Sequence, residues 1–306
     1  MKQIKLGTRG SQLALVQARW VADSLEALHR SVQVEIVTIT TKGDMQTGPL
    51  STGGDTGLFT KAIEDALLRG EVDIAVHSLK DLPTVQPAGL AIAAVPERLD
   101  PHDALVSRDG MTLDQLGKGA RVGTSSVRRK AQLLAFNPEI EVVPLRGNLD
   151  TRIRRVLDGD FDAIVVAKAG LIRMQRDDVK AVSLPFDKVL SAAGQGALAV
   201  EARQDDRELL ELLAELNHAE SEATTRAERT VLDRLGAGCQ VPIGVLAETM
   251  GDGGLRLRCA VFSEDGRDVV QADSTGTDTG AVVDEVVNNL VEQGAETLIK
   301  DARQDE

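Results

Sequence analysis

Two short segments of this chain share a pattern that limits what the chain can fold into. Residues 6–11 (LGTRGS) and 122–126 (VGTSS) each place an apolar residue, Gly and Thr between a predicted strand and apolar residues at helical spacing. A strand joined to a helix by a tight turn is the building unit of α/β proteins. The repeated pattern therefore predicts two similar α/β domains.

Strands and helices alternate around both turns. In the first half of the chain we predict strands at 4–6, 32–39 and 72–76, and helices at 13–28 and 58–69. In the second half we predict strands at 104–106, 120–122, 142–144 and 163–166, and helices at 126–136 and 149–157. Such alternation is typical of parallel sheets. The Gly-, Thr- and Asp-rich segment 41–57 has little periodicity and is predicted to be a mobile loop.

The last third of the chain has a different pattern. Gly194 and Gly196 lead into an apolar strand at 198–201, which we expect to return the chain to the first domain. Helical patterns follow at 208–216 and 221–235. After Gly236 we predict strands at 245–248, 255–261 and 269–272 and a helix at 281–292.

These patterns divide the chain into three predicted domains. A chain of 306 residues is longer than most single cores allow. We predict domain 1 at 1–97 and 197–216, domain 2 at 101–192, and domain 3 at 219–306. The predicted fold class is α/β: domains 1 and 2 are similar and surround a cleft, as in periplasmic binding proteins, and domain 3 is a small α+β domain.

Charge and cysteine content limit the classes of partner. The formal net charge is −13 without a basic tail, which argues against nucleic acid or an anionic membrane as the main partner. The first residues lack the apolar core of a signal peptide, and no apolar run approaches the ~18 residues of a membrane helix. Cys239 and Cys259 lie far apart, and the four His show no metal-ligand spacing. We expect a cytoplasmic protein without a disulfide framework or metal.

One basic segment stands out in this acidic chain. Residues 121–155 hold seven Arg and one Lys against three acidic residues, an excess of five positive charges. Solvated helix faces account for many single arginines. However, a helix N-terminus offers free N–H groups to a carboxylate or phosphate, although capping the helix is the commoner role of a serine such as Ser11 or Ser126. Arg128 and Arg129 would surround an anion at the second turn, so the segment predicts an anion site.

Two further segments carry reactive side chains. Lys80 and Asp81 follow a predicted strand, at the end where open α/β sheets place their ligands. An adjacent Lys and Asp are more often a solvated loop pair. Cys239 lies in a Gly-rich loop and is a candidate nucleophile or attachment point, although a lone Cys more often packs inertly. The residues alone predict a cleft for polyanionic small molecules and do not name a reaction.

Six motifs resemble those of the porphobilinogen deaminase family. They are TRGS at 8–11, GLFTK at 57–61, HSLKDLP at 77–83, GTSSVRR at 123–129, LRGN at 145–148 and GAGCQVPIG at 236–244. They occur in the family's order and span most of the chain. The resemblance implies an enzyme that condenses four porphobilinogen molecules head to tail with loss of ammonia. Hydrolysis then releases the linear tetrapyrrole hydroxymethylbilane.

The resemblance also implies a monomer with a dipyrromethane cofactor, bound through a thioether to Cys239, and Asp81 as the catalytic group. A fixed carboxylate stabilises the positive charge left on the pyrrole after ammonia departs, and it can also move protons. The implied cofactor-binding residues are Cys239, Lys80, Ser126, Arg128, Arg129 and Asp44. The implied substrate-binding residues are Arg9, Ser11, Thr124, Ser125, Arg146, Arg152, Arg173 and Gln195.

The chain differs from the family's motifs at one place, and two other functions were considered. The family's loop often has Lys near GLF, whereas this chain has Ser51, Asp55 and Thr56, so no lysine contact is expected from this part of the loop. The main alternative is a non-catalytic two-lobed anion-binding protein, for which the Cys239 loop has no use. A transcriptional effector-binding domain is a second alternative, and the acidic composition opposes it.

Overall fold

The computed structural model describes residues 2–41, 60–238, 240–251 and 253–304, and shows a mixed α/β protein. Contacts divide the chain into two compact units. The first unit comprises Met1–Leu99 and Gly196–Thr225, and the second comprises Asp100–Gln195 and Arg226–Glu306. The predicted loop at 41–57 lies, from residue 42 onward, outside the described residues.

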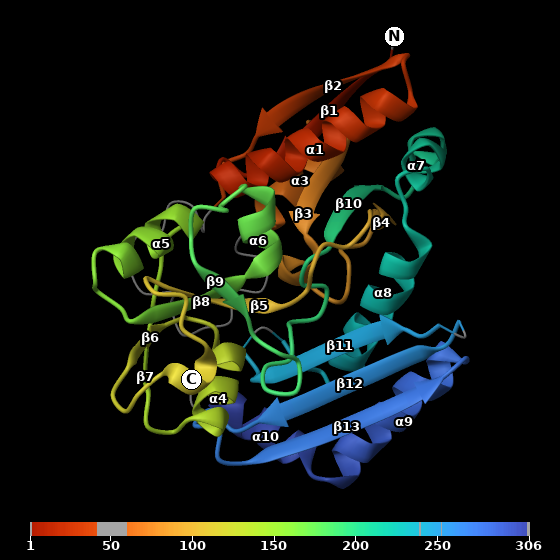
Figure 1. Cartoon of the computed structure of the whole chain (residues 1–306). Coiled ribbons are helices and arrows are strands. Elements are labelled where there is room, and N and C mark those ends of the chain that lie inside the picture. The colour runs from red at the N-terminus through yellow and green to blue at the C-terminus, as the bar shows by residue number, and fades with distance from the viewer. Residues whose placement is uncertain (1, 42–59, 239, 252, 305–306) are drawn as a thin grey trace. The chain divides into compact units, whose positions relative to one another are not determined.

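The first unit contains a five-stranded sheet of order β2-β1-β3-β10-β4 (Figure 1). Its strands are β1 (Lys2–Thr8), β2 (Val32–Thr38), β3 (Ile74–Ser78), β4 (Leu90–Ala94) and β10 (Leu198–Arg203). Its helices are α1 (Gln12–Leu28), α3 (Lys61–Leu68), the 3-10 turn η1 (Leu79–Asp81) and α7 (Arg207–Ala214). Apolar side chains of α1 and α7 pack on one face of the sheet and those of α3 on the other.

The second unit contains a five-stranded sheet of order β7-β6-β8-β5-β9. Its strands are β5 (Asp103–Ser107), β6 (Arg121–Gly123), β7 (Glu141–Val143), β8 (Ala163–Ala167) and β9 (Ala181–Ser183). Its helical elements are η2 (Leu113–Gln115), α4 (Val127–Phe136), α5 (Leu149–Leu157) and α6 (Lys168–Arg173). Side chains of α4 pack on one face and those of α5 on the other, as α1 and α3 do in the first unit.

The two sheets share one topology and one register. Residues 6 and 7 lie opposite 74 and 75 in parallel strands, and residues 122 and 123 lie opposite 163 and 164 in the same way. The fourth strand of each sheet, β10 or β5, is antiparallel to its neighbours. Gly123 lets the neighbouring side chains pack closely, because a Cβ there would lie 2.9 Å from the Leu145 side chain and 3.0 Å from that of Ile164. The predicted pair of similar α/β lobes is confirmed.

A three-stranded antiparallel sheet, β11-β12-β13, completes the second unit (Figure 1). Its elements are β11 (Ile243–Thr249), β12 (Leu255–Phe262), β13 (Val269–Gly276), α9 (Thr279–Glu292) and α10 (Ala295–Gln304). The helix α8 (Ala219–Arg234) precedes the sheet in the chain. Val286 and Leu290 of α9 are fully buried against Val245 and Leu257. The predicted small C-terminal α+β region is confirmed.

The structure corrects one expectation about the sheets and adds elements that were not predicted. They are mixed rather than wholly parallel, because β5 and β10 enter antiparallel after the chain passes between the units. The sequence analysis did not predict β4, β9, α6 or α10; β9 and α6 have too few residues to show a period. The predicted return of residues 198–201 to the first domain is confirmed by the pairing of β10 with β3. The boundary between domains 2 and 3, and the cleft, stay predictions.

The described residues include no helix with the length and apolar character needed to cross a lipid bilayer.

Candidate functional site

In the first unit, two of the predicted site segments lie at the same edge of the sheet. Because β1 and β3 are parallel, the turn with Arg9 and Ser11 and the turn with Lys80 and Asp81 both follow carboxyl ends of neighbouring strands. Ser11 caps α1, since its Oγ accepts a hydrogen bond from the backbone N–H of Ala14 at 3.3 Å. Arg9 is partly buried. Arg9, Ser11, Lys80 and Asp81 are thus brought to one edge of this sheet.

The turn that carries Asp81 is anchored by its neighbours. Leu79 is 1% exposed, and its backbone N–H donates to the carbonyl oxygen of Ala197 at 3.1 Å. Ser78 accepts a hydrogen bond at Oγ from Nε2 of Gln17 on α1 at 3.0 Å. Asp81 is exposed and Lys80 partly buried. The anchored backbone therefore presents an accessible carboxylate in a fixed place.

In the second unit, the turn between β6 and α4 is held by its own hydroxyl groups. Thr124 Oγ1 accepts from the backbone N–H of Ser126 at 3.2 Å. Ser126 caps α4 by accepting from the N–H of Arg129 at 3.4 Å. Ser125 Oγ donates to the carbonyl of Leu145 at 2.8 Å and accepts from its N–H at 3.0 Å. These hydroxyls shape the turn beside the helix N-terminus.

A buried carboxylate that the sequence analysis missed lies at this edge. Asp103, the first residue of β5, is 0% exposed. Its Oδ2 lies 2.7 Å from Nη1 of Arg128, and its Oδ1 accepts from Nη2 of Arg129 at 2.7 Å. Gln195 Nε2 donates to the same Oδ1 at 2.9 Å. Three sequence-predicted site residues thus meet on one aspartate.

The electrostatics of this network follow from burial. Burial alone would raise the pKa of Asp103, but Arg128 and Arg129 outweigh it and hold the pKa of this carboxyl well below its ordinary value. Burial lowers the pKa of Arg128, Asp103 opposes this, and the positive charge of Arg129 adds to it. One carboxylate faces two guanidinium groups, so the network retains positive charge. Asp103 begins an otherwise mostly apolar strand, so nothing in the sequence marked it as the partner of the two arginines.

The remaining predicted arginines of the second unit lie around the same edge. Arg152, near the start of α5, donates from Nε to the carbonyl of Gly147 at 2.8 Å. Burial, and then the positive charge of Arg129, lower the pKa of Arg152. Burial lowers the pKa of Arg173, the last residue of α6, to about 10. Arg146 is exposed on the loop that precedes α5.

Not all of the basic segment at 121–155 belongs to this edge. Arg121 and Arg155 lie over the ring of Phe161, at 5.6 and 4.8 Å from its centroid. Arg155 also donates to Asp160 at 2.8 Å. Since residues 160 and 161 precede β8, these two arginines lie at its amino end. For Arg121 and Arg155, a surface position outside the anion site is therefore the better interpretation.

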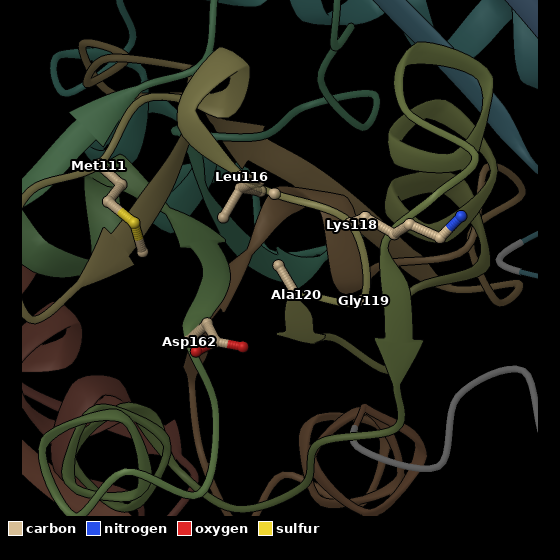
Figure 2. Close-up of a pocket in the computed structure, with 7 residues that line it drawn as sticks. Met111, Leu116, Lys118, Gly119, Ala120 and Asp162 are labelled. Atoms are coloured by element: carbon tan, nitrogen blue, oxygen red, sulfur yellow. The ribbon is translucent and has the colours of Figure 1, made fainter.

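A pocket opens at the amino end of the same sheet. It is lined by Met111, Leu116, Gly117, Lys118, Gly119, Ala120 and Asp162 (Figure 2). Ala120 precedes β6 and Asp162 precedes β8, so the pocket is at the opposite sheet edge from the 124–126 turn. Asp162 accepts from the N–H of Arg121 at 2.7 Å. None of the sequence-predicted site residues lines this pocket.

Cys239 and Asp44 lie outside the described residues. The described part of the loop before Cys239 ends at Gly238. Gly236 ends α8 with a φ of +60°, and the N–H of Ala237 donates to the carbonyl of Leu232 at 2.8 Å, a Schellman cap. Gly238 is exposed. The other cysteine, Cys259, is buried in β12, and burial raises the pKa of its thiol.

Comparison with known proteins identifies the family. The family model described as porphobilinogen deaminase, dipyromethane cofactor binding domain, matches residues 4–211. The porphobilinogen deaminase C-terminal domain matches residues 222–292. The chain belongs to the porphobilinogen deaminase family. The predicted resemblance to this family is therefore confirmed.

Named members of the porphobilinogen deaminase family match over nearly the whole chain. The porphobilinogen deaminase of Pelotomaculum thermopropionicum is 48% identical over 308 residues, which covers 100% of this chain and 98% of the relative. That of Desulforamulus reducens is 46% identical over 304 residues, 98% of each chain. Among solved structures, an ancestral cationic amino acid solute-binding protein has a TM-score of 0.45 at 15% identity, covering 70% of this chain and 87% of that one.

The residues of the second unit fit the dipyrromethane cofactor of this family. Each pyrrole ring of such a group carries an acetate and a propionate, so the cofactor is a polyanion. Guanidinium groups whose pKa is lowered by burial, as for Arg152 and Arg173, gain stability when a carboxylate comes close. The N-terminus of α4 adds a partial positive charge at the same edge. The donor set is therefore the one that a multiply charged carboxylate ligand requires.

Proposed function

We propose that this chain is a hydroxymethylbilane synthase, a transferase of tetrapyrrole biosynthesis. It condenses four porphobilinogen molecules head to tail with loss of ammonia and releases hydroxymethylbilane by hydrolysis. Membership of the porphobilinogen deaminase family along the whole chain carries this proposal. Nothing on either sheet edge favours the alternative of a non-catalytic anion-binding protein.

The cofactor would be held by the edge of the second unit and by one thiol. Cys239 would bind it covalently, while Ser126, Arg128, Arg129, Lys80 and Asp44 would hold its side chains. When bound, the dipyrromethane group supplies the nucleophilic ring to which the first substrate is joined. The inertness of Cys259 supports Cys239 as the attachment residue, because a buried thiol with a raised pKa seldom ionises. The exposure of Gly238, next to Cys239, agrees with a reactive loop.

Asp81 would stabilise the cationic intermediate and transfer protons. Its carboxylate is exposed on a turn whose neighbour Leu79 is buried, so it can stay in place while substrates change. A fixed negative charge stabilises the cation left when ammonia departs, and the same oxygen atoms can accept the proton released on coupling. The arginines at 9, 146, 152 and 173, with Ser11, Thr124, Ser125 and Gln195, would bind the carboxylates of the substrate and of the growing chain.

The net charge of the chain bears on its localisation and partners. We propose a cytoplasmic monomer that binds small molecules and has neither nucleic acid nor a membrane as its partner. A net charge of −13 repels both phosphate backbones and anionic lipids, which supports this assignment. Size-exclusion chromatography with light scattering tests the monomer, which requires a mass near 32.6 kDa.

Turnover of porphobilinogen tests the function directly. Purified holoprotein incubated with porphobilinogen should release ammonia and a linear tetrapyrrole. In Cys239→Ser, the intact mass should equal the chain alone, whereas the parent should exceed it by two linked pyrroles. Cys259→Ala is the matched control and should keep the adduct. No turnover by a holoprotein that carries the adduct would favour simple binding instead.

A further inference from the structure

Three titratable side chains are buried next to the turn that carries Asp81. His77 comes from β3, Glu201 from β10 and Glu64 from α3, and they are 6%, 0% and 6% exposed. Nε2 of His77 lies 3.2 Å from Oε2 of Glu201. His77 is four residues before Asp81 in the chain. The sequence analysis found no metal-ligand spacing around the four His and did not single out the two glutamates.

The position of this group in the sheet is well defined. His77 lies opposite Ala199, and Glu201 lies opposite Ala75, so the pair is diagonal on one face of adjacent antiparallel strands. Ala75 belongs to the apolar cluster beneath α3. Ala199 belongs to the apolar cluster that contains Leu79 of the Asp81 turn. The hydrogen-bonded pair therefore lies between residues of two apolar clusters, one of which contains Leu79 of the turn.

The fold itself does not require charges at these places. By register, Val166 and Val106 of the second unit occupy the places of His77 and Glu201. Both valines are buried in a sheet of the same topology. Replacing a buried ion pair by apolar residues is often neutral or stabilising. The polar pair in the first unit is thus an addition to a fold that forms without it.

Two carboxyl groups share this buried place with one imidazole. Oε1 of Glu64 and Oε1 of Glu201 have no hydrogen-bond partner among the described residues. Burial, and then the charge of Glu201, raise the pKa of Glu64; His77 and the Thr60 side chain oppose this shift, and Asp65 adds a smaller repulsion. Glu64 therefore keeps its proton at a pH where an exposed Glu has lost it.

We propose that His77 and Glu201 are positioning residues, which fix the direction in which the end of β3 presents Lys80 and Asp81. The inference rests on the proposed function. The chain around β10 holds the end of β3 and the turn at two places: the carbonyl of Ala197, directly before β10, accepts from the N–H of Leu79, and the Glu201 side chain forms a hydrogen bond with His77. Loss of the proton from Glu64 would place a second negative charge beside the pair and weaken that hold.

The test uses holoenzyme with the double variant His77→Val/Glu201→Val, which copies the second unit and should fold. We expect kcat to fall about tenfold or more with KM within about twofold, because a displaced catalytic carboxylate slows the chemistry. Hydrogen exchange of the Leu79 and Leu82 amides should become faster. The matched control is Arg203→Gln, at the far end of β10, which should keep the parent kcat and exchange even if its melting temperature falls.

The pH profile of Glu64→Gln supplies a readout that packing alone would not move. The alkaline limb of kcat should shift to higher pH in this variant, since its amide cannot lose the proton. A folded double variant with the parent kcat and exchange rates would overturn the inference, as would equal losses in Arg203→Gln. A parent without turnover would refute the proposed function, while the exchange rates would still decide the positioning role.

Discussion

The carboxyl edges of the two five-stranded sheets share a backbone and differ in where they bury charge. Both sheets pair their strands in the same register. In the second unit, Asp103 begins the antiparallel strand and meets Arg128 and Arg129. By register, the place of Asp103 is taken in the first unit by Leu198, which is also buried. An ion network in one unit thus replaces an apolar contact in the other.

Farther from the carboxyl edge of the same sheets, the first unit has polar side chains where the second has apolar ones. The first unit buries His77 and Glu201 where the second has Val166 and Val106. One backbone plan therefore supports two different electrostatic tasks. Buried guanidinium groups in the second unit suit the holding of a polyanion, whereas the exposed Asp81 of the first unit suits the stabilisation of a transient cation.

The largest expected effect concerns how much the Asp103–Arg128–Arg129 network stabilises the second unit. Asp103→Asn should lower the free energy of unfolding by about 3 to 5 kcal/mol, because it leaves two buried cations with a neutral partner. The pKa of Asp103 is lowered in the folded state, so its contribution is present above its ordinary pKa of 3.8 and is lost as the pH falls below it. Urea unfolding of parent and variant at several pH values measures this.

The control for this prediction is an exposed pair in the same unit. Asp160→Asn removes the partner of Arg155 at the amino end of the sheet and should cost less than about 1 kcal/mol. If Asp103→Asn were no more destabilising than this control, the buried network would not be the feature that distinguishes the two units.

The next effect concerns the first unit. Asp81→Asn should lower kcat by about 10²- to 10³-fold, as expected when a group that stabilises developing charge is removed. Folding should not change, because the side chain is exposed. Steady-state rates with porphobilinogen measure the loss, and Asp23→Asn on α1 is the control for an exposed aspartate. Rates within a factor of two of the parent would remove Asp81 from the chemistry.

The smallest effect separates binding from chemistry. Arg173→Ala should raise KM by about tenfold with a smaller change in kcat, since it would remove one charge-assisted contact to a substrate carboxylate. The melting temperature of the variant should not fall, because burial already disfavours the charged form of this side chain. A variant with the parent KM but a lower melting temperature would give Arg173 a structural role instead.

Local pattern was enough to predict most of the fold. The Gly-Thr turns, the helix caps at Ser11 and Ser126 and the strand that returns the chain at 198 all depend on neighbouring residues, which a sequence displays. Three-residue strands such as β9 show no period, and the antiparallel insertion of β5 depends on the path of the chain between units.

Sequence motifs predicted the residues of the candidate site, but not the long-range contacts between them. Residues such as Lys80 and Arg129 stand in motifs, so their importance was visible before their partners were. Asp103 and Glu201 stand in ordinary apolar strands, and only long-range pairing brings them to Arg129 and His77. Buried counter-charges between distant strands are therefore the part of such a site that the sequence does not reveal.

The division of work between the two edges is tested most directly by the intact masses of two variants. If the second unit holds the cofactor and the first performs the chemistry, purified Asp81→Asn should carry an excess of two linked pyrroles over the mass of its chain, and folded Arg129→Gln should carry little or none. A bare Asp81→Asn chain beside a fully loaded Arg129→Gln protein would contradict the account.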